Sequence, residues 1–419
     1  MARTTKQDTV RELQRTLYRA AKADSGRRFH ALYDKVHRRD VLERAWELVR
    51  ANHGAAGIDK QTIADVERYG VTRLLDQLAT DLQEGGWRPL PARRVFIPKP
   101  GREELRPLSI PAVRDRIVQA AAKLVIEPIF EAGMLECSFG FRPRRSAHDA
   151  LQVLVDEAWG GRRWIVESDV ANCFEAIPHS QLMSAIEERI VGRNVLKLLR
   201  AMLRAGVMED RAVRRTGAGT PQGGVISPCL CNVYLHRLDR QWTERGAGVL
   251  VRYADDVVVM CRTRQEAEHA LVALREILSE LGLTLKDAKT RIVELREAGR
   301  GWIFSASITA GCAGTRPLHG ISASLPAGPH IRRCGTPASG SMNSRTAAGC
   351  GYQSKRSYGT STASCAAGRG TSATETLLSP STRSRSTRSC AWRASSPNVT
   401  NVVAGMAGGR SISPRTGWD

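Results

Sequence analysis

Apolar residues recur at helical spacing in two stretches of the chain. Leu42, Ala45, Trp46 and Val49 share one face of a helix over residues 42–51. Both this stretch and a longer one over 266–281 predict amphipathic helices that bury one side against a core. In the longer stretch the apolar residues are Ala267, Ala270, Leu271, Leu274, Ile277, Leu278 and Leu281.

Three short runs have the apolar, β-branched character of strands. They lie at 95–97, 164–166 and 257–260. Because helices and strands are mixed along the chain, we predict an α+β fold with helices on one side of a sheet. The pattern covers about 28–300, the part of the sequence that is typical of a folded protein.

The chain changes character after Trp302. Residues 303–419 hold 13 Lys and Arg but only two acids, Glu375 and Asp419, and they are rich in Ser, Thr, Gly and Ala. Such a composition cannot bury enough apolar area to offset chain entropy. We therefore predict a disordered C-terminal region; a basic RNA-binding tail is the functional alternative.

Composition narrows the class of protein. The chain has 419 residues with 63 Lys and Arg against 42 Asp and Glu, so its formal net charge is +21. This excess favours a polyanionic partner such as nucleic acid, although a merely basic protein has the same charge. The sequence contains no apolar run of 18 residues or more, and its start does not read as a secretory signal. The length predicts about two to four domains.

The ten cysteines carry no recognisable chemistry. They form no Cys-x-x-Cys pair, and the closest two, Cys229 and Cys231, suit neither a zinc knuckle nor a disulfide. Without a secretion signal, we interpret them as reduced thiols in a cytosol.

Acidic residues at two places give the sequence its candidate chemistry. Asp255 and Asp256 lie between β-like stretches, which predicts a tight hairpin. Adjacent carboxylates repel each other and need a cation or solvent. Far upstream, the strand-like run 164–166 leads to Asp169. If that strand pairs beside the hairpin, the acids converge and offer the oxygen ligands that Mg²⁺ prefers. Taken singly, each Asp would be a cap or a turn residue.

Seven ordered motifs surround these acids. In chain order they are 96–101, 106–111, 138–143, Asp169 with Phe174 five positions later, 219–228, the Tyr-Ala-Asp-Asp box at 253–256, and 282–285 with 289–290. Together they resemble the reverse transcriptases, and most closely the group II intron-encoded reverse transcriptase/maturases. The Tyr-Ala-Asp-Asp box alone would be a weak signal, whereas seven motifs in order across about 28–295 are a strong one.

The resemblance implies a fold and an activity. The fold would be a right-hand polymerase with fingers and a palm built on an antiparallel sheet. The activity would be Mg²⁺-dependent nucleotidyl transfer onto a primer 3′-OH by an RNA-directed DNA polymerase. The implied partners are group II intron RNA, an RNA template, a DNA primer and dNTPs, with no membrane. The implied location is the bacterial cytoplasm, on the intron ribonucleoprotein.

The same resemblance assigns roles to the acids. Asp169 and Asp255 are expected to ligate two Mg²⁺ ions. Asp256 is the third acid of the metal site, and it tunes the site or contacts the primer terminus. Catalysis would then depend on positioning and charge neutralisation rather than on a side-chain acid or base.

Five further residues are implied in nucleotide binding. Phe174 would lie under the incoming sugar and exclude a 2′-hydroxyl, unless it is an ordinary core residue. Gln222 lies in a Pro-Gln-Gly-Gly turn, where glycines allow the backbone to approach a ligand closely. Lys99 and Arg106 are candidates for the triphosphate, with solvated fingers charges as the alternative. Lys289 is placed near the primer or the triphosphate.

Four segments follow from these motifs. Residues 1–27 would be a flexible N-terminal arm, and residues 28–60 an extension that binds RNA or template. A capping helix on the fingers is the alternative for that extension. Residues 61–300 would form the fingers and palm. Residues 301–419 would be a basic, low-complexity tail in place of the thumb/maturase domain of the family.

The tail has a specific explanation. When each codon of 302–310 and of 359–377 is shifted by the same offset, allowed codons spell two blocks of the missing family domain. The hypothesis is a frameshift near codon 301, with a genuine disordered tail as the alternative. The coding DNA decides between them. Loss of the thumb predicts poor or absent activity in this particular chain.

Two other functions remain open at this point. One is an RNA-binding splicing factor with a silent polymerase site, and the retained Asp169, Asp255 and Asp256 argue against it. The other is a different, retron-like reverse transcriptase. Replacing Asp255 by Ala separates the first from a polymerase, because splicing assistance would survive while DNA synthesis would stop.

Overall fold

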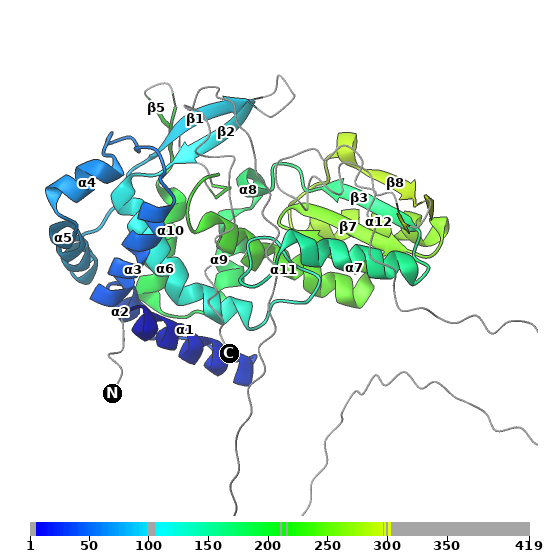
Figure 1. The fold of residues 1–419 in the computed structure, drawn as a ribbon, viewed down its shortest axis with the longest axis horizontal. Coiled ribbons are helices and arrows are strands. Elements are labelled where there is room, and N and C mark those ends of the chain that lie inside the picture. Colours follow the sequence, from blue (N-terminus) through cyan, green and yellow to red (C-terminus); the bar gives the residue numbers. More distant parts are fainter. Residues whose placement is uncertain are drawn as a thin grey trace, which may run out of the picture. The chain divides into compact units, whose positions relative to one another are not determined.

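A computed structural model describes residues 6–98, 105–209, 212–214, 217–220, 222–295, 297–298 and 301–302 of the chain (Figure 1). The expected tail at 301–419 therefore lies almost wholly outside the described residues. In chain order the elements are α1 (Lys6–Ala23), α2 (Tyr33–Val36), α3 (Arg39–Ala51), α4 (Ile63–Tyr69), α5 (Val71–Gln83), β1 (Ala92–Pro98), β2 (Leu105–Ile110), α6 (Val113–Glu131), α7 (Ala147–Trp159), β3 (Trp164–Asp169), α8 (Cys173–Ala176), α9 (His179–Glu187), α10 (Arg193–Arg204), β4 (Val207–Glu209), β5 (Ala212–Arg214), α11 (Ser227–Arg245), β6 (Val249–Tyr253), β7 (Asp256–Cys261), α12 (Arg264–Glu280), the 3-10 helix η1 (Asp287–Lys289), β8 (Arg291–Glu294), β9 (Glu297–Ala298) and β10 (Gly301–Trp302).

Both helices predicted from apolar spacing are confirmed. α3 buries Leu42, Ala45, Trp46 and Val49, and α12 covers nearly the whole of the predicted stretch 266–281. Runs 95–97, 164–166 and 257–260 lie in β1, β3 and β7, as predicted.

The N-terminal helices α1 and α3 pack around α6. α6 is buried along almost its whole length. The flexible arm expected for 1–27 is therefore wrong over Lys6–Ala23. Val10, Gln14, Leu17 and Ala21 follow one another at helical spacing and are all buried. The stripe is hard to recognise in the sequence, because the helix is otherwise rich in charged residues.

A mixed four-stranded sheet contains the predicted fingers hairpin. Its strand order is β2-β1-β4-β5. β1 and β2 are antiparallel, with Val95 opposite Leu108 and Ile97 opposite Arg106. β4 pairs with β1 in parallel and with β5 in antiparallel fashion. Arg106 is thereby fixed on a regular strand.

The second four-stranded sheet is antiparallel throughout and has the order β6-β7-β3-β8. β3, which ends at Asp169, lies between β7 and β8. The hairpin strand β7 is its direct neighbour. The pairing that would bring the predicted acids together is therefore present.

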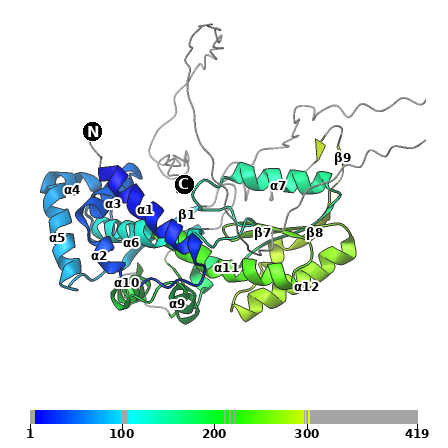
Figure 2. The same cartoon turned by 90° about the horizontal axis from the view of Figure 1, so that it is seen from below.

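Helices cover both faces of this antiparallel sheet. Ile165, Val258 and Met260 pack with α7 on one face, whereas Val166, Val257 and Val259 belong to the core shared with α12 on the other. Figure 2 shows α7 and α12 on opposite sides of β7 and β8. The expectation of helices on one side only is wrong. Consecutive apolar residues such as 257–260 indicate a strand that is buried on both faces.

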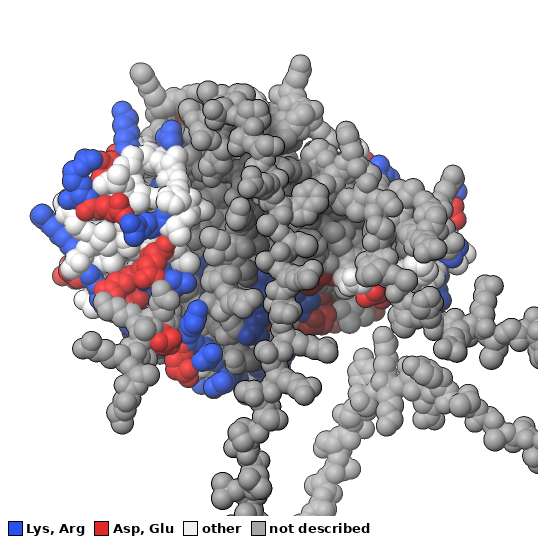
Figure 3. Space-filling model, in the orientation of Figure 1, with Lys and Arg blue, Asp and Glu red and all other residues white. Residues whose placement is uncertain are grey.

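Charges of both signs are interspersed on the part of the surface that Figure 3 shows over α4 and α5. Arg68 pairs with Asp65 at 3.1 Å, for example. The positive excess of the sequence is therefore not gathered there. Among the helices that the structure describes, none combines the length and the hydropathy needed to cross a lipid bilayer.

Candidate active site

The predicted hairpin joins β6 to β7 through a two-residue turn. Tyr253 pairs with Asp256, which leaves Ala254 and Asp255 as the turn. Ala254 has φ of +58°, in the left-handed region that residues with a Cβ rarely occupy. A positive φ at the first turn position matches the twist of tight β-hairpins. The sequence-based prediction of the hairpin is confirmed.

β3 brings Asp169 to the same end of the sheet. Asp169 lies directly opposite Asp256 in the β3–β7 register, and the Val170 N–H donates to the Asp255 carbonyl at 3.0 Å. Directly opposed residues of antiparallel strands point to the same face. Two segments more than 80 positions apart in the chain therefore bring Asp169 and Asp256 opposite each other, with Asp255 in the adjoining turn.

The acids are crowded, and the crowding shifts their protonation. Burial raises the pKa of Asp255. Burial, reinforced by the charges of Asp255 and Glu167, raises the pKa of Asp256 to about 7. Arg106 opposes the shift at both. Two neighbouring carboxylates that resist ionisation gain from a cation between them.

Glu167 was missed by the sequence analysis. It lies two positions before Asp169 on β3, so both point to the same face of the sheet. Glu167 is buried and accepts a hydrogen bond from Arg291 Nε at 2.7 Å. Its spacing from Asp169 was a signal, because an acid in an otherwise apolar strand is unusual.

Lys289 lies against Asp169. The residue ends η1, and its Nζ forms an ion pair with Asp169 Oδ2. The Lys286 N–H donates to the Asp169 carbonyl at 2.9 Å, which fixes the segment beside β3. Lys289 was expected near the primer or the triphosphate. The structure places it beside a predicted metal ligand.

The acid cluster has the chemistry of a divalent-cation site. Its donors are carboxylate oxygens, which suit Mg²⁺, and the raised pKa of Asp256 reflects excess negative charge in a buried place. Within the described ranges, however, no three His, Cys, Asp or Glu side chains are already grouped as a set of metal ligands. The residues fit a cation by charge and donor type.

A cavity of about 580 Å³ is lined by Arg106, Phe174 and Gln222. The charge of Arg106 also lowers the pKa of Asp255 and of Asp256, so this arginine links the cavity electrostatically to the acids. Three of the five predicted nucleotide-binding residues are thus brought together, and Lys289 lies at Asp169. The fifth, Lys99, lies outside the described residues.

Backbone contacts fix Phe174 in this cavity. It follows Asn172, which has φ of +45°, at the start of the single-turn helix α8. The Thr220 N–H donates to the Phe174 carbonyl at 2.6 Å. Gly219 permits this approach, because a Cβ there would lie 2.9 Å from the Glu175 carbonyl oxygen. The Gly219 motif thus holds the segment after Asp169 in place.

The turn at Gln222 is fixed against β2. The Ser109 N–H donates to the Gln222 carbonyl at 2.6 Å. Gly223 has φ of +104°, and a Cβ there would lie 2.5 Å from the Ser109 carbonyl oxygen. The glycine was predicted to let the backbone approach a ligand. In the structure it lets the turn approach the backbone of the protein itself.

Asn52, Arg116 and Phe141 also line the cavity. Sequence reasoning assigned none of them to nucleotide binding, although Phe141 lies in the motif at 138–143 and Asn52 in the extension at 28–60. Arg116 is only 5% exposed, and its Nη2 donates to the Ala55 carbonyl at 2.6 Å. Phe141 is 53% exposed and has φ of +58°. An exposed aromatic with such a backbone is a candidate binding residue, but the sequence gives no sign of that φ.

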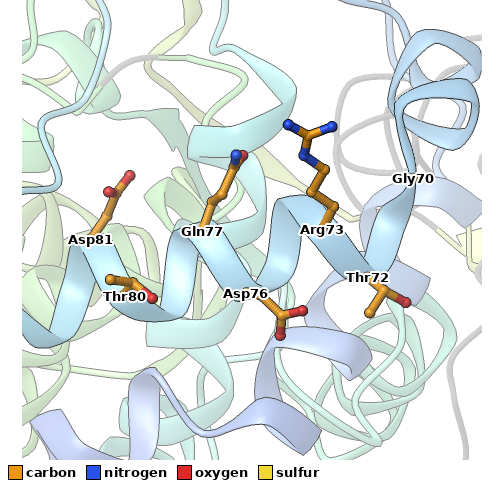
Figure 4. Close-up of a pocket in the computed structure, with 7 residues that line it drawn as sticks. All are labelled: Gly70, Thr72, Arg73, Asp76, Gln77, Thr80 and Asp81. Atoms are coloured by element: carbon orange, nitrogen blue, oxygen red, sulfur yellow. The ribbon is translucent and has the colours of Figure 1, made fainter.

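A second hollow, of about 650 Å³, lies along α5. Figure 4 shows Arg73, Gln77 and Asp81 on one side of this helix and Thr72 and Asp76 on another. Its acids already have partners, since Asp76 pairs with Arg39 and Asp81 with Arg114. It contains none of the predicted site residues.

Comparisons with known proteins agree with the geometry. A family model described as "Reverse transcriptase (RNA-dependent DNA polymerase)" matches residues 97–319, more than half of the chain. "Group II intron-encoded protein LtrA" of Lactococcus lactis subsp. cremoris is 36% identical over 212 residues, which are 51% of this chain and 35% of that protein. The chain thus spans about a third of LtrA's length.

Two further similarities differ in weight. "Protein YkfC" of Escherichia coli (strain K12) is 33% identical over 340 residues, which cover 70% of this chain and 87% of that protein. A solved "Partial Cas6-RT-Cas1--Cas2 complex" has a TM-score of 0.39 at 23% identity, over 60% of this chain and 41% of that one, which is too distant to bear on function. The chain belongs to the reverse transcriptase (RNA-dependent DNA polymerase) family.

Proposed function

We propose that this chain is an RNA-directed DNA polymerase that adds deoxynucleotides to the 3′-OH of a DNA primer on an RNA template. One observation carries the proposal: Asp169 lies opposite Asp256 and is linked through Val170 to Asp255, beside a cavity lined by Arg106. Phosphoryl transfer requires positioned charges of this kind: acids that can hold metal ions, and a guanidinium beside a cavity for the phosphates.

The acids would hold the metal. Reverse transcriptases generally use divalent metal ions, and we propose two Mg²⁺ ions at Asp169, Asp255 and Asp256. When bound, such ions neutralise charge on the attacking and leaving oxygens of the transfer. The protein contributes the fixed register of β3 and β7, which places the carboxylates before any substrate arrives.

The cavity would take the incoming dNTP. Arg106 is suited to the triphosphate, because a guanidinium binds phosphate oxygens with two parallel hydrogen bonds. Phe174 would lie against the sugar and disfavour a 2′-hydroxyl, and Gln222, which also lines the cavity, would contact the nucleotide. Lys99 and Lys289 would add positive charge for the triphosphate or the primer terminus.

The partners follow from the family. A reverse transcriptase acts on a nucleic-acid template and primer, and relatives of this chain are named as intron-encoded proteins. We propose group II intron RNA as a partner, bound partly by the extension at 28–60. We also propose a maturase role in splicing, impaired in this chain, and a location on the intron ribonucleoprotein in the bacterial cytoplasm.

The domain boundaries remain part of the proposal. Residues 61–300 would form the fingers and palm, and the tail from 301 would be the product of a frameshift in place of the thumb/maturase domain. Sequencing the coding DNA tests this. Codons compatible with the family blocks at both 302–310 and 359–377 are expected, and incompatible codons at either site would remove the hypothesis.

Primer extension tests the activity. The full chain, in excess over an RNA template with a DNA primer, is given one dNTP and Mg²⁺. Slow, template-directed addition is expected if residues 301–419 stand in place of the thumb that grips the duplex. Asp255→Ala should lower the rate at least ~1,000-fold, since charge stabilisation at a reacting phosphate is worth that much. Glu268→Ala, on the exposed ion pair with Arg264, is the matched control and should keep the parent rate.

Primer extension together with a splicing assay tests a second function. Relatives include a protein named "Nuclear intron maturase 4, mitochondrial" from Arabidopsis thaliana, which favours splicing assistance as an alternative to polymerisation. Intron splicing assisted by the chain without any template-directed addition, even at high enzyme excess, would contradict the polymerase proposal. Addition that persists in Asp255→Ala would contradict the assigned site.

A further inference from the structure

A buried arginine lies directly behind the turn that carries Asp255. Arg252, on β6, has no exposed surface. Successive residues of a strand point to opposite faces, so its side chain leaves the sheet on the face away from Tyr253. There it meets Asp239 and Asn232 of α11.

All five N–H groups of the guanidinium have acceptors. Two of them form a fork with Asp239: Nε donates to Oδ1 at 2.7 Å and Nη2 to Oδ2 at 2.6 Å. Nη2 also donates to Ser138 Oγ at 2.8 Å, and Nη1 donates to Asn232 Oδ1 at 3.0 Å. The remaining N–H of Nη1 donates to the Ala254 carbonyl at 2.9 Å. The guanidinium is thus anchored on α11 through Asp239 and Asn232, and it is hydrogen-bonded to the turn through the Ala254 carbonyl.

The turn that it grips is in an unusual conformation. Ala254 has φ of +58°, and such a backbone persists only where the surroundings over-determine it. Arg252 holds it by the carbonyl. Gly140 packs against it closely, because a Cβ on Gly140 would lie 2.4 Å from the Ala254 nitrogen. The Gly140 carbonyl is itself held by Asn232 Nδ2 at 2.8 Å.

Stability alone does not explain this arrangement. Buried ion pairs are often replaceable by apolar side chains of similar volume without loss of stability, because desolvation offsets their attraction. An apolar side chain, however, cannot donate to the Ala254 carbonyl. What the buried pair adds is a fixed donor at one point of the turn, next to Asp255.

We propose that Arg252 is a positioning residue for the proposed polymerase. Anchored by Asp239 and Asn232, it holds the Ala254 carbonyl and so presents Asp255 beside Asp169. The inference rests on the proposed function and deepens it: Arg252 touches no reactant and acts only through the turn.

The test removes both charges of the pair, so that no lone charge stays buried. In the full chain, Arg252→Met is combined with Asp239→Leu. In single-nucleotide extension under enzyme excess, the maximal rate is expected to fall about 100-fold, because a shift near 1 Å at a reacting group costs that much. The apparent Kd for the dNTP should stay within about threefold, since only transition-state geometry is lost.

A control variant and a second test variant accompany this double variant. The half-buried pair of Arg162 and Glu157 lies at the end of α7, at 2.6 Å. Arg162→Met with Glu157→Leu should keep the parent rate. Arg252→Lys keeps the charge but not the planar fork, so it should lose about tenfold. It supplies the test if the double variant does not fold.

Amide hydrogen exchange gives a readout that needs no turnover. Loss of positioning predicts faster exchange confined to 249–261, with α1 and α3 unchanged, whereas a merely structural role predicts faster exchange throughout. A parent-like rate in the folded double variant, or faster exchange throughout, would overturn the positioning role. Absence of Asp255-dependent extension by the parent chain would instead overturn the proposed function.

Discussion

The two faces of the β6–β7 hairpin hold their charges in opposite ways. On the face that carries Asp169 of β3, Asp256 lies opposite Asp169. Burial, reinforced by the nearby charges of Asp255 and Glu167, raises the pKa of Asp256 to about 7. On the other face, Arg252 has no exposed surface and an acceptor for every N–H. One face carries excess negative charge, and the other is fully compensated.

The difference separates two tasks. A site meant to receive a cation keeps charges that repel each other, and this repulsion lowers stability until the cation binds. The support behind it must not move, and a fully satisfied network provides that rigidity. Residues of both kinds lie within a few positions of each other, because a strand alternates its side chains between faces.

The largest expected effect is on the rate, and it comes from a substitution among the acids of the hairpin. Asp255→Asn should lower the single-turnover rate at least ~1,000-fold, because a metal-ligand charge is lost. The free energy of unfolding at pH 8 should stay equal or rise, since burial disfavours the charged form of Asp255. Urea denaturation of both proteins checks it. A clear loss of stability would show that this carboxylate supports the fold.

On the face of Arg252, where the charges are compensated, we predict the reverse effect on stability. Arg252→Ala alone should lower the free energy of unfolding by about 3–5 kcal/mol, because it leaves the carboxylate of Asp239 buried without its partner. Urea denaturation measures this loss, and the double variant with Asp239→Leu should recover most of it. A loss below about 1 kcal/mol would mean that water reaches the site.

A buried carboxylate away from the hairpin sharpens the comparison. Burial raises the pKa of Asp115 to about 6, and its Oδ2 accepts one hydrogen bond, from the Leu90 N–H at 2.9 Å. The folded state therefore binds the proton more tightly than the unfolded one, so its contribution to stability is present below about pH 4 and is lost as pH rises to about 6.

Asp115→Asn should remove this dependence and raise the free energy of unfolding at pH 8 by ~2–3 kcal/mol. Chemical denaturation at pH 5 and pH 8 checks it. Equal stability of parent and variant at both values would mean that Asp115 titrates normally.

The smallest expected effect concerns nucleotide choice. Phe174 lines the cavity beside the acids, and Phe174→Ala should improve the use of an rNTP relative to the dNTP by about tenfold, because room for a 2′-hydroxyl opens. Competing single-nucleotide extensions measure the ratio. An unchanged ratio, with both nucleotides used less well, would indicate a core role for the ring.

Local patterns in the sequence predicted much of this molecule. The spacing in α3 and α12, the hairpin at Asp255 and the strand ending at Asp169 depend on neighbours in the chain, and all are present. The ordered motifs also indicated the convergence of acids from separate segments. These features could be predicted because their signals are short and periodic.

The rest depends on partners far away in the sequence. Nothing near Arg252 indicates that Ser138 would receive its hydrogen bond, and nothing near Arg116 indicates that it would anchor the loop at Ala55. The second helical layer over the sheet, α7, was missed for the same reason, since pairing of faces is a long-range property. Such contacts become visible only when distant segments pack.

Substitution of one acid by a thiol tests the central claim most directly. In Asp169→Cys, single-nucleotide extension with Mg²⁺ should be lost, because thiolates bind hard cations poorly. Softer ions such as Mn²⁺ or Cd²⁺ should restore part of the rate in this variant relative to the parent. Full activity with Mg²⁺, or a loss that is the same with every ion, would contradict a metal site at Asp169.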